Sequence, residues 1–481
     1  MEPSGQTGVE YDQVGKDYFE NRQLKRGAAG WLLLVGLGIA YVISGDYAGW
    51  NFGLGQGGWG GLMIASLLMA IMYTFMCFSL AELATVAPTA GGGYGFARRA
   101  FGPWGGYMTG VAILIEYAIA PAAIAVFIGG YMRSLFEVDI SQWVISAGFY
   151  AVFLGIHVYG AGEALRLIFA ITALAVVALI VWVVAMVPFF DSAKLFDIAV
   201  SPDAVGASPF LPFGYFGIWA AIPFAMWFFL AIEGVPLAAE ETSDPTRDLP
   251  RGLIGGMFVL LAFCALIMIF GPGGVGSEAL KANTNPLVAA LEHPSTYGGP
   301  TWISKFVNFV GLAGLIASFF SIIYAYSRLV FAMSRAGYLP RGLSLTNARQ
   351  SPWVALIVPG IVGFLLSLTG QGDQLILMAV FGATISYILM MASHIKLRLS
   401  EPNLPRAYRT PGGIFTSGTA LVLACIALMA VFVGDQKMDV LGTPMSVAFL
   451  SAIAYVVFLA YFALYSRHHL VAGAPGEEDP V

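Results

Sequence analysis

Charged side chains are scarce in this sequence: only 11% of its 481 residues are Asp, Glu, Lys or Arg, whereas 58% are hydrophobic. A soluble domain carries about 25% charged residues, so most of this protein's surface cannot face water. The net charge of −5 also leaves no basic excess for binding nucleic acid. The composition therefore predicts an integral membrane protein that is surrounded by a lipid bilayer and has no nucleic-acid partner.

Cysteine is scarce too, and Cys77, Cys264 and Cys425 each stand alone in an apolar run. Such residues are expected to pack as small hydrophobic side chains, not to form disulfides or metal sites. Neither the cysteines nor the histidines show metal-ligand spacing, and no nucleophile–base pair or phosphate-binding loop is visible. We therefore expect no metal, no cofactor and no enzymatic activity.

What the sequence does contain is a series of long apolar runs. A helix needs about 20 apolar residues to cross the hydrocarbon core of a bilayer, and backbone within lipid must satisfy its own hydrogen bonds. The runs predict an all-α membrane protein with twelve transmembrane helices, near 30–54, 61–86, 104–133, 142–160, 164–190, 214–239, 252–273, 302–334, 353–371, 374–394, 414–434 and 443–466. The polar stretches between them are expected to be loops.

Basic residues predict the orientation. If residues 1–29 lie inside the cell, the inner stretches hold 18 of the 23 Lys and Arg residues, which agrees with the positive-inside rule. Residues 1–29 are polar and do not resemble a cleavable signal peptide. We therefore expect a multi-pass protein of the cytoplasmic (inner) membrane, with residues 1–29 and the tail 467–481 both cytoplasmic.

Four acidic residues fall within predicted spans: Asp46, Glu82, Glu116 and Glu233. Ionisable groups at membrane depth are costly and therefore mark functional sites by default. No Lys or Arg lies near the middle of any span, so either a positive ligand visits these acids or the acids are protonated. Glu82 lies near the end of its span and is expected to be structural.

Asp46 and Glu233 stand beside residues that break helices. Asp46 lies in the segment Ser44–Gly49 (SGDYAG), and Glu233 is followed by Gly234 and Pro236. Glycine and proline interrupt helices, and interrupted helices in matching positions of two halves indicate the substrate site of a transporter. Gly can instead serve close packing, and a Gly-Pro pair can be a simple kink. Two acid-bearing interruptions, five helices apart, favour the substrate site.

This spacing predicts a five-plus-five inverted repeat, with broken helices one and six. The first repeat would span residues 30–190, the second residues 214–394, and two added helices residues 414–466. Three roles stay open for Glu116: a third site carboxylate, a proton relay, or an acid hydrogen-bonded between helices. Aromatic rings near the breaks suit an ammonium group through cation–π attraction. The candidate substrate-binding residues are Ser44, Gly45, Asp46, Gly49, Trp50, Glu116, Phe229, Glu233 and Gly234.

Three motifs occur in the order found in one transporter superfamily. They are residues 81–105 (AELATVAPTAGGGYGFARRAFGPWG), 240–251 (EETSDPTRDLPR) and 326–340 (YSRLVFAMSRAGYLP). Together they resemble the amino acid–polyamine–organocation (APC) superfamily, over roughly residues 25–467. Residues 41–51 (YVISGDYAGWN) and 228–237 (FFLAIEGVPL) are similar to the ethanolamine permeases of that superfamily. The resemblance implies the five-plus-five fold and inward uptake of ethanolamine, with protons or by exchange.

One departure from the amino acid permeases bears on the substrate. Those relatives have a Gly-Ser-Gly type segment in helix one, whose free amides hold the carboxylate of the substrate. Here Asp46 lies in that segment, where an acid would repel a carboxylate and attract an amine. We therefore expect a small cationic amine such as ethanolamine as the substrate, with an amino acid permease of the same fold as the alternative.

The coupling ion, H⁺ or Na⁺, stays open. Ser318 and Ser321 would offer hydroxyl groups to sodium, although serine in membrane helices more often bonds the backbone. Proton coupling would run through Glu116 or Glu233. On the inner face, two outcomes are about equally expected for the acids Glu240, Glu241, Asp244 and Asp248: pairs with Arg98, Arg99 or Arg251 that latch the closed state, or solvated loop charges. The sequence does not predict the oligomeric state.

Overall fold

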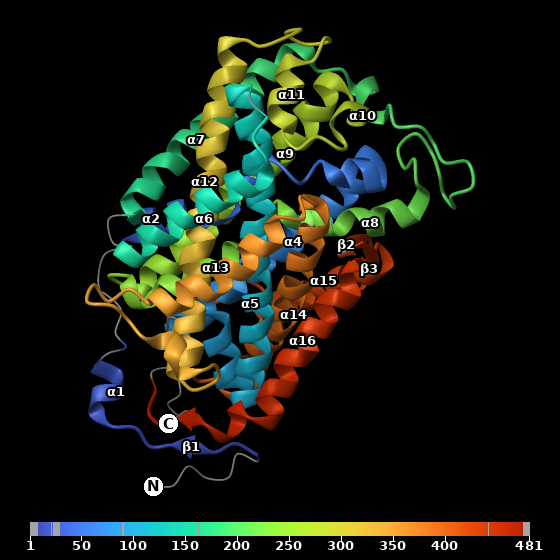
Figure 1. Cartoon of the computed structure of the whole chain (residues 1–481). Helices are drawn as coiled ribbons and strands as arrows, with labels where there is room; N and C mark the ends of the chain where they lie inside the picture. The colour runs from blue at the N-terminus through green and yellow to red at the C-terminus, as the bar shows by residue number, and fades with distance from the viewer. Residues whose placement is uncertain are drawn as a thin grey trace.

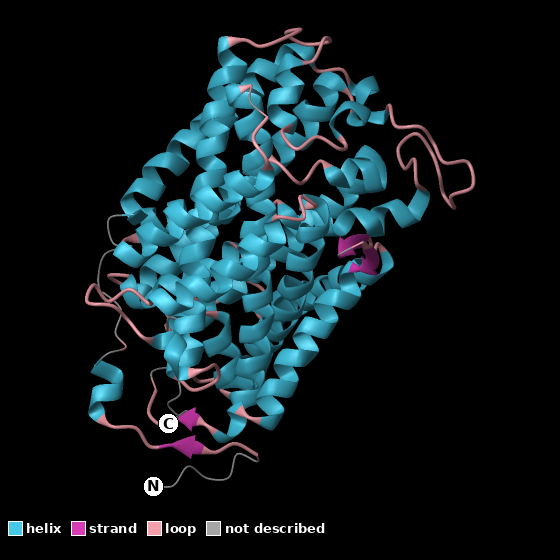
Figure 2. Ribbon diagram, viewed as in Figure 1, coloured by secondary structure: helices cyan, strands magenta, loops and turns pink. Residues whose placement is uncertain are grey.

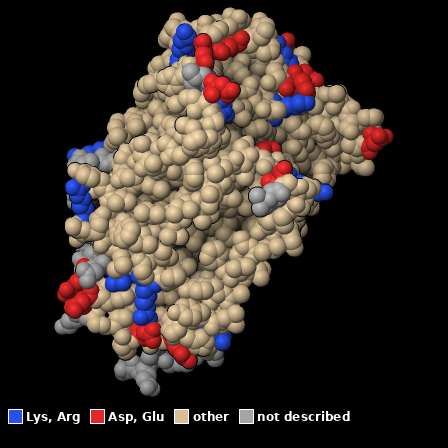
Figure 3. Space-filling view, in the orientation of Figure 1, with Lys and Arg blue, Asp and Glu red and all other residues tan. Residues whose placement is uncertain are grey.

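The computed structural model describes residues 8–20, 22, 29–88, 91–137, 139–160, 164–440 and 442–474. Ten helical spans in this part of the chain are long and apolar enough to cross a membrane, so the prediction of a helical multi-pass membrane protein is confirmed. Charged side chains gather toward the ends of the molecule and leave an apolar belt between them (Figure 3). This belt is the surface that lipid would cover.

Eleven elements form the main part of these spans. They are α4 (Phe52–Val86), α5 (Gly93–Phe136), α6 (Gln142–Tyr159), α7 (Ala164–Met186), α8 (Gly214–Trp227) continued by the 3₁₀ helix η3 (Ile232–Glu241), α9 (Pro245–Val275), α12 (Trp302–Arg335), α14 (Gly372–Ser400), α15 (Ile414–Val433) and α16 (Val447–Leu464).

The remaining elements are short. The helices are α1 (Lys16–Glu20), α2 (Trp31–Val42), α3 (Ser44–Tyr47), α10 (Ser277–Leu280), α11 (Pro286–Glu292) and α13 (Trp353–Ser367), with the 3₁₀ helices η1 (Val187–Phe189), η2 (Ser192–Phe196), η4 (Arg341–Ser344) and η5 (Ser466–His468). The strands are β1 (Tyr11–Asp12), β2 (Lys437–Val440), β3 (Thr443–Ser446) and β4 (Leu470–Val471). Figure 2 shows how small the strand content is beside the helices.

Two predicted spans differ from the structure in length. The segment 30–54 contains α2, of 12 residues, and the segment 353–371 contains α13, of 15 residues. Both are apolar but shorter than the helices that qualify as spans on length. The first is short because the backbone turns at Ile43 and again at 48–51, after which α4 begins. Segments predicted as loops, 274–301 and 395–413, instead contain α10, α11 and the last turns of α14.

Two helices begin earlier than predicted because a glycine bends them without ending them. α4 is kinked at Gly58 (φ 66°) and α5 at Gly102 (φ 74°), where Pro103 follows. A positive φ is readily adopted only by glycine. The predicted spans 61–86 and 104–133 are therefore the longer arms of these kinked helices.

Helix α5 lies at the centre of the bundle, where it packs against α14, α12 and α13 (Figure 1). Of the apolar 18-residue stretch of α5, 94% is buried inside the protein, whereas only 22% of the corresponding stretch of α6 is buried. This difference places Glu116, on α5, in the core, and it leaves one side of α6 on the lipid-facing surface.

The two ends of the described chain lie together. Strand β1 pairs in parallel with β4, with Tyr11 opposite Leu470, and β2 pairs antiparallel with β3. Arg341 of η4 pairs with Asp12 at 2.5 Å. The segments next to the two termini therefore lie on the same side of the bundle (Figure 1).

Candidate functional site

The backbone is interrupted at both of the predicted places, and the two interruptions touch. Helix α2 ends at Val42 and α8 ends at Trp227, followed by turns at 228–231. A Cβ atom placed on Gly45 would lie 2.3 Å from the carbonyl oxygen of Trp227, so only hydrogen fits between these two chains. The indole N–H of Trp227 donates to the carbonyl of Ala48 at 2.9 Å. Gly45 and the segment after it are thus held against the break between α8 and η3.

Gly49 completes this contact. Its φ is +100°, and a Cβ atom there would meet the indole nitrogen of Trp227 at 2.5 Å. The neighbouring carbonyl of Tyr47 accepts from the hydroxyl of Tyr131 on α5 at 3.0 Å. The turn after α3 is therefore fixed from two sides.

Glu233 is buried at the start of η3, with its carboxylate between two tyrosines. The Tyr117 hydroxyl donates to Oε1 at 2.8 Å, and the Tyr387 hydroxyl donates to Oε2 at 2.9 Å. Tyr73 of α4 donates in turn to Tyr387 at 3.2 Å. These donors are neutral, so they orient the carboxylate without cancelling its charge. An ionised carboxylate buried among such donors would attract a cation.

Glu116 belongs to the same cluster. Its Oε1 lies 3.5 Å from the Tyr387 hydroxyl, which also contacts Glu233, while its Oε2 has no hydrogen-bond partner within the described residues. Gly234 borders the cluster, because a Cβ atom there would lie 3.0 Å from the Tyr117 hydroxyl. Helices α5 and α14 thus bring Glu116, Tyr117 and Tyr387 to Glu233.

Asp46 does not join this cluster, contrary to the expectation that Asp46 and Glu233 act together. It is fully buried, and neither carboxylate oxygen has a hydrogen-bond partner in the part of the chain that is described. Helix α3, which carries it, packs against α9 as well as α12. The reason is helical geometry: Ser44 faces α12, and two residues further on the side chain points roughly to the opposite side. The carboxylate beside Glu233 is Glu116.

The serines proposed for the coupling ion have different roles. Ser318 of α12 donates to the carbonyl of Tyr41 at 2.7 Å, and its oxygen lies 2.9 Å from that of Ser44. It therefore ties α12 to the break after α2. Ser321 donates to Ala317 of its own helix at 2.7 Å, which is the backbone-bonding role that serine usually has in a membrane helix.

The two aromatic candidates, Phe229 and Trp50, lie in different surroundings. Phe229 lies with its ring centroid 5.4 Å from that of Tyr73, next to the glutamate cluster. Trp50 instead stacks on Phe228, with 5.7 Å between the ring centroids. Phe229 is thus placed beside Glu233 and its tyrosines, and Trp50 is not.

At the end of η3, acids pair with arginines of α12. Glu241 accepts from Arg328 at 2.9 Å and from the Tyr324 hydroxyl at 2.5 Å, and both charged groups are buried. Glu240 pairs with Arg335 at 3.1 Å. The sequence does not predict these two arginine partners of Glu240 and Glu241. Both arginines belong to α12, where Arg328 and Arg335 lie about two turns apart on one face of the helix.

Glu82 has a structural environment, as its position near a helix end suggests. Its carboxylate contacts Arg406 at 2.8 Å, Arg398 at 2.5 Å and His394 at 3.3 Å, and it accepts from the backbone amide of Thr410 at 2.7 Å. Glu82 thereby anchors the connection between α14 and α15 to the end of α4.

Comparison with known proteins shows the family to which this chain belongs. The family model described as amino acid permease matches residues 30–459, which is most of the chain. The chain belongs to the amino acid permease family. The permease is thus a transporter of the APC superfamily, as its three motifs predict.

Named relatives of the permease are membrane transporters. An uncharacterized transporter of Rhizobium meliloti is 28% identical, over 83% of this chain and 85% of its own length. A branched-chain amino acid permease of Bacillus subtilis is 26% identical, over 85% of this chain and 86% of its own length. A methylthioribose transporter of Bacillus subtilis is 25% identical, over 91% of both chains.

Sequence reasoning missed several residues of the permease's site. Tyr117 directly follows Glu116, so a polar side chain beside a core acid could have indicated it. Tyr73 and Tyr387 have no acid or helix breaker beside them in the sequence, and nothing local distinguishes them from the other tyrosines. Trp227 is one of several aromatic residues near the break, and nothing in the sequence distinguishes it from the others.

Proposed function

We propose that this permease is a secondary active transporter that imports a small solute carrying an amino group, with amino acids as the substrate class. The observation that supports the proposal is the buried pair Glu116 and Glu233, which share the Tyr387 hydroxyl at the break between α8 and η3. Neutral tyrosine donors leave the negative charge for an ammonium group to balance. The relatives include branched-chain amino acid permeases, which favours amino acids over other amines.

The second candidate substrate is an amine without a carboxylate, such as ethanolamine. One observation favours it: Asp46 is buried without a hydrogen-bond donor among the described residues, in the segment where relatives hold the carboxylate of the substrate. An unpaired acid there would repel the carboxylate of an amino acid.

The proposed mechanism is alternating access in a five-plus-five inverted repeat of twelve helices, in which α2 and α13 supply the shorter spans. The ammonium group binds to Glu233 and Glu116 beside Phe229, and freed carbonyls at the two breaks accept further hydrogen bonds. The bundle that carries both breaks then rocks against the rest. The pair Arg328–Glu241 closes the inner side of this path, and both termini lie in the cytoplasm.

The ion that drives transport is H⁺ or Na⁺ in this proposal. A proton would be carried by the Glu116–Glu233 pair, whereas sodium would bind near Ser318, where the carbonyl of Tyr41 and the hydroxyl of Ser44 converge.

The test is uptake into proteoliposomes of labelled leucine, alanine, arginine and ethanolamine, under imposed proton or sodium gradients. We expect saturable amino acid uptake that one gradient drives and that Glu233→Gln abolishes while the protein stays folded. Glu137→Gln is the matched control, because Glu137 is exposed. Uptake of ethanolamine alone would establish the second candidate, and saturable uptake of none of the four would overturn both.

A further inference from the structure

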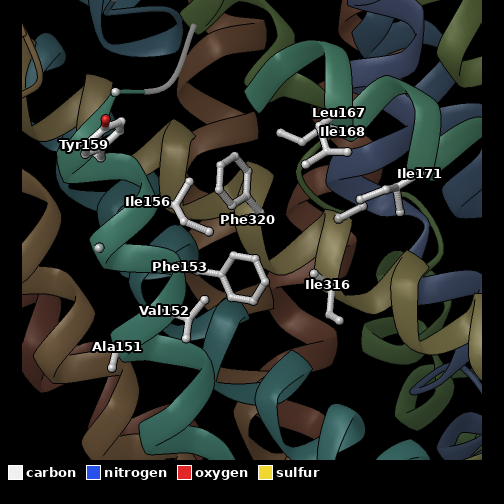
Figure 4. A pocket seen from close by; sticks show the side chains of 13 residues that line it. Ala151, Val152, Phe153, Ile156, Tyr159, Leu167, Ile168, Ile171, Ile316 and Phe320 are labelled. Carbon is white, nitrogen blue, oxygen red and sulfur yellow. The ribbon is translucent and has the colours of Figure 1, made fainter. Parts of the chain in front are cut away.

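A deep apolar groove lies between α6, α7 and α12, well apart from the glutamate cluster. Its volume is about 590 Å³, within the roughly 300–1,000 Å³ range of small-molecule sites. Figure 4 shows side chains of α6 facing those of α7 across the groove, with α12 forming its floor. The walls include Val152, Phe153, Ile156, Leu167, Ile171 and Phe320.

This groove opens on the lipid-facing surface. Val152 is 56% exposed, Ile156 41% and Leu167 61%, and α6 is the least buried of the ten spans. Within the apolar belt such a concave surface meets acyl chains and not water. The groove is therefore shaped and placed for a hydrocarbon chain.

One end of the groove is polar, and its geometry is fixed. Tyr159, the last residue of α6, lines this end and is 70% exposed. The Arg349 guanidinium lies 3.5 Å from the centroid of the Tyr159 ring and donates to the Tyr159 carbonyl at 3.0 Å. The segment that carries Arg349 is held to α6 by two more bonds, from Asn347 to Val158 and from Ser351 to His157, each 2.7 Å.

A second arginine stands at the same end. Arg166 is exposed in the first turn of α7, next to Leu167 of the groove wall. Neither arginine has an acidic partner within the described residues, so their remaining N–H groups are available to an anion. Guanidinium groups bind phosphate oxygens in a bidentate manner, and a tyrosine at the end of a span is typical of the membrane interface.

We propose that this groove binds an anionic phospholipid, with one acyl chain between α6, α7 and α12 and the phosphate at Arg349 and Arg166. The charge selects the headgroup, and the apolar walls select a lipid over free phosphate. The floor of the groove adjoins functional parts of the permease, because Ala317 of its lining precedes Ser318, which is bonded to Tyr41. A bound lipid would therefore pack against the part of α12 that is bonded to the break after α2.

The first test measures lipid retention by the purified permease, using native mass spectrometry with phosphatidylglycerol and phosphatidylcholine. We expect phosphatidylglycerol to be retained preferentially. Arg349→Gln and Arg166→Gln should each weaken that retention about fivefold, the effect expected of one basic residue at an anionic membrane surface. Arg247→Gln is the control, because Arg247 is an exposed arginine on α9, away from the groove. Equal retention by all three variants would overturn the headgroup site.

The second test fills the groove. Gly155 lines it on α6 and has open space where a side chain would stand, so Gly155→Leu occupies the groove without a clash. Gly148 is exposed on the same helix two turns earlier, also with open space, and lies outside the lining, so Gly148→Leu is its matched control. We expect only Gly155→Leu to release phosphatidylglycerol, and glycerol 3-phosphate not to displace it. Equal retention in the two leucine variants, or displacement by glycerol 3-phosphate, would contradict an acyl-chain site.

Discussion

Gly45 packs directly against the carbonyl oxygen of Trp227, so closely that a methyl group on Gly45 would approach that oxygen to 2.3 Å. The contact joins the break after α2 to the break after α8, and both breaks carry a buried acid. Because the clashing atom belongs to the backbone, it cannot swing away as a long side chain would. The two breaks therefore act as one structural unit at this point.

Gly45→Ala tests that unit. We expect transport to be lost and the protein to be destabilised by about 1–3 kcal/mol, the usual effect of overpacking a buried contact. Uptake into proteoliposomes and unfolding in mixed micelles are the measurements. Gly148→Ala serves as the control, because nothing lies within 4 Å of its added carbon. Normal uptake by Gly45→Ala would show that the breaks do not need this close contact.

Tyr387→Phe removes the hydroxyl that lies between the two glutamates. A hydrogen bond to a charged group contributes about 1.5–3 kcal/mol, so we expect the KM for uptake to rise at least about tenfold because Glu233 loses its orientation. Tyr107→Phe is the control, since its hydroxyl donates to the carbonyl of Phe458, in α16, at 2.8 Å and to no acid among the described residues. An unchanged KM in Tyr387→Phe, with the same fold, would place the substrate elsewhere.

Ser318 and Ser321 form a matched pair, because both are fully buried on α12 but only Ser318 bonds another helix. We expect Ser318→Ala to reduce uptake strongly and Ser321→Ala to leave it nearly unchanged. If sodium is the coupling ion, Ser318→Ala should also raise the sodium concentration that gives half-maximal uptake. Equal effects of the two substitutions would mean that the bond to Tyr41 has no part in transport.

The buried pair Arg328–Glu241 should show strong coupling. Arg328→Met leaves the Glu241 charge buried without its cation, and removing one partner of such a pair costs about 3–5 kcal/mol of unfolding free energy. Arg328→Met combined with Glu241→Gln should be less destabilised than Arg328→Met alone. The pair Arg99–Glu401 is the control: its side chains are 26% and 28% exposed, and exposed pairs contribute only about 0–1 kcal/mol. Additive effects at Arg328 and Glu241 would contradict the coupling.

Local patterns predicted a large part of the fold. The long apolar runs, the small number of charges and the glycines beside Asp46 and Glu233 gave the spans and the two interruptions, because these depend on the neighbouring residues alone. Helix lengths were less predictable, since the kinks at Gly58 and Gly102 continue a helix where the sequence suggests an end. The short helices α10 and α11 lie in a segment too polar to be recognised by its hydropathy.

The candidate site was predicted only in part, for a physical reason. Acids at membrane depth are costly in any fold, so the sequence by itself marked Asp46, Glu116 and Glu233. Which of them meet depends on the rotation of each helix and on the helices packed beside it. Only the tertiary structure brought Tyr387 of α14 and Glu116 of α5 to Glu233, left Asp46 without a hydrogen-bond partner among the described residues, and paired Glu241 with Arg328, 87 residues further along the chain.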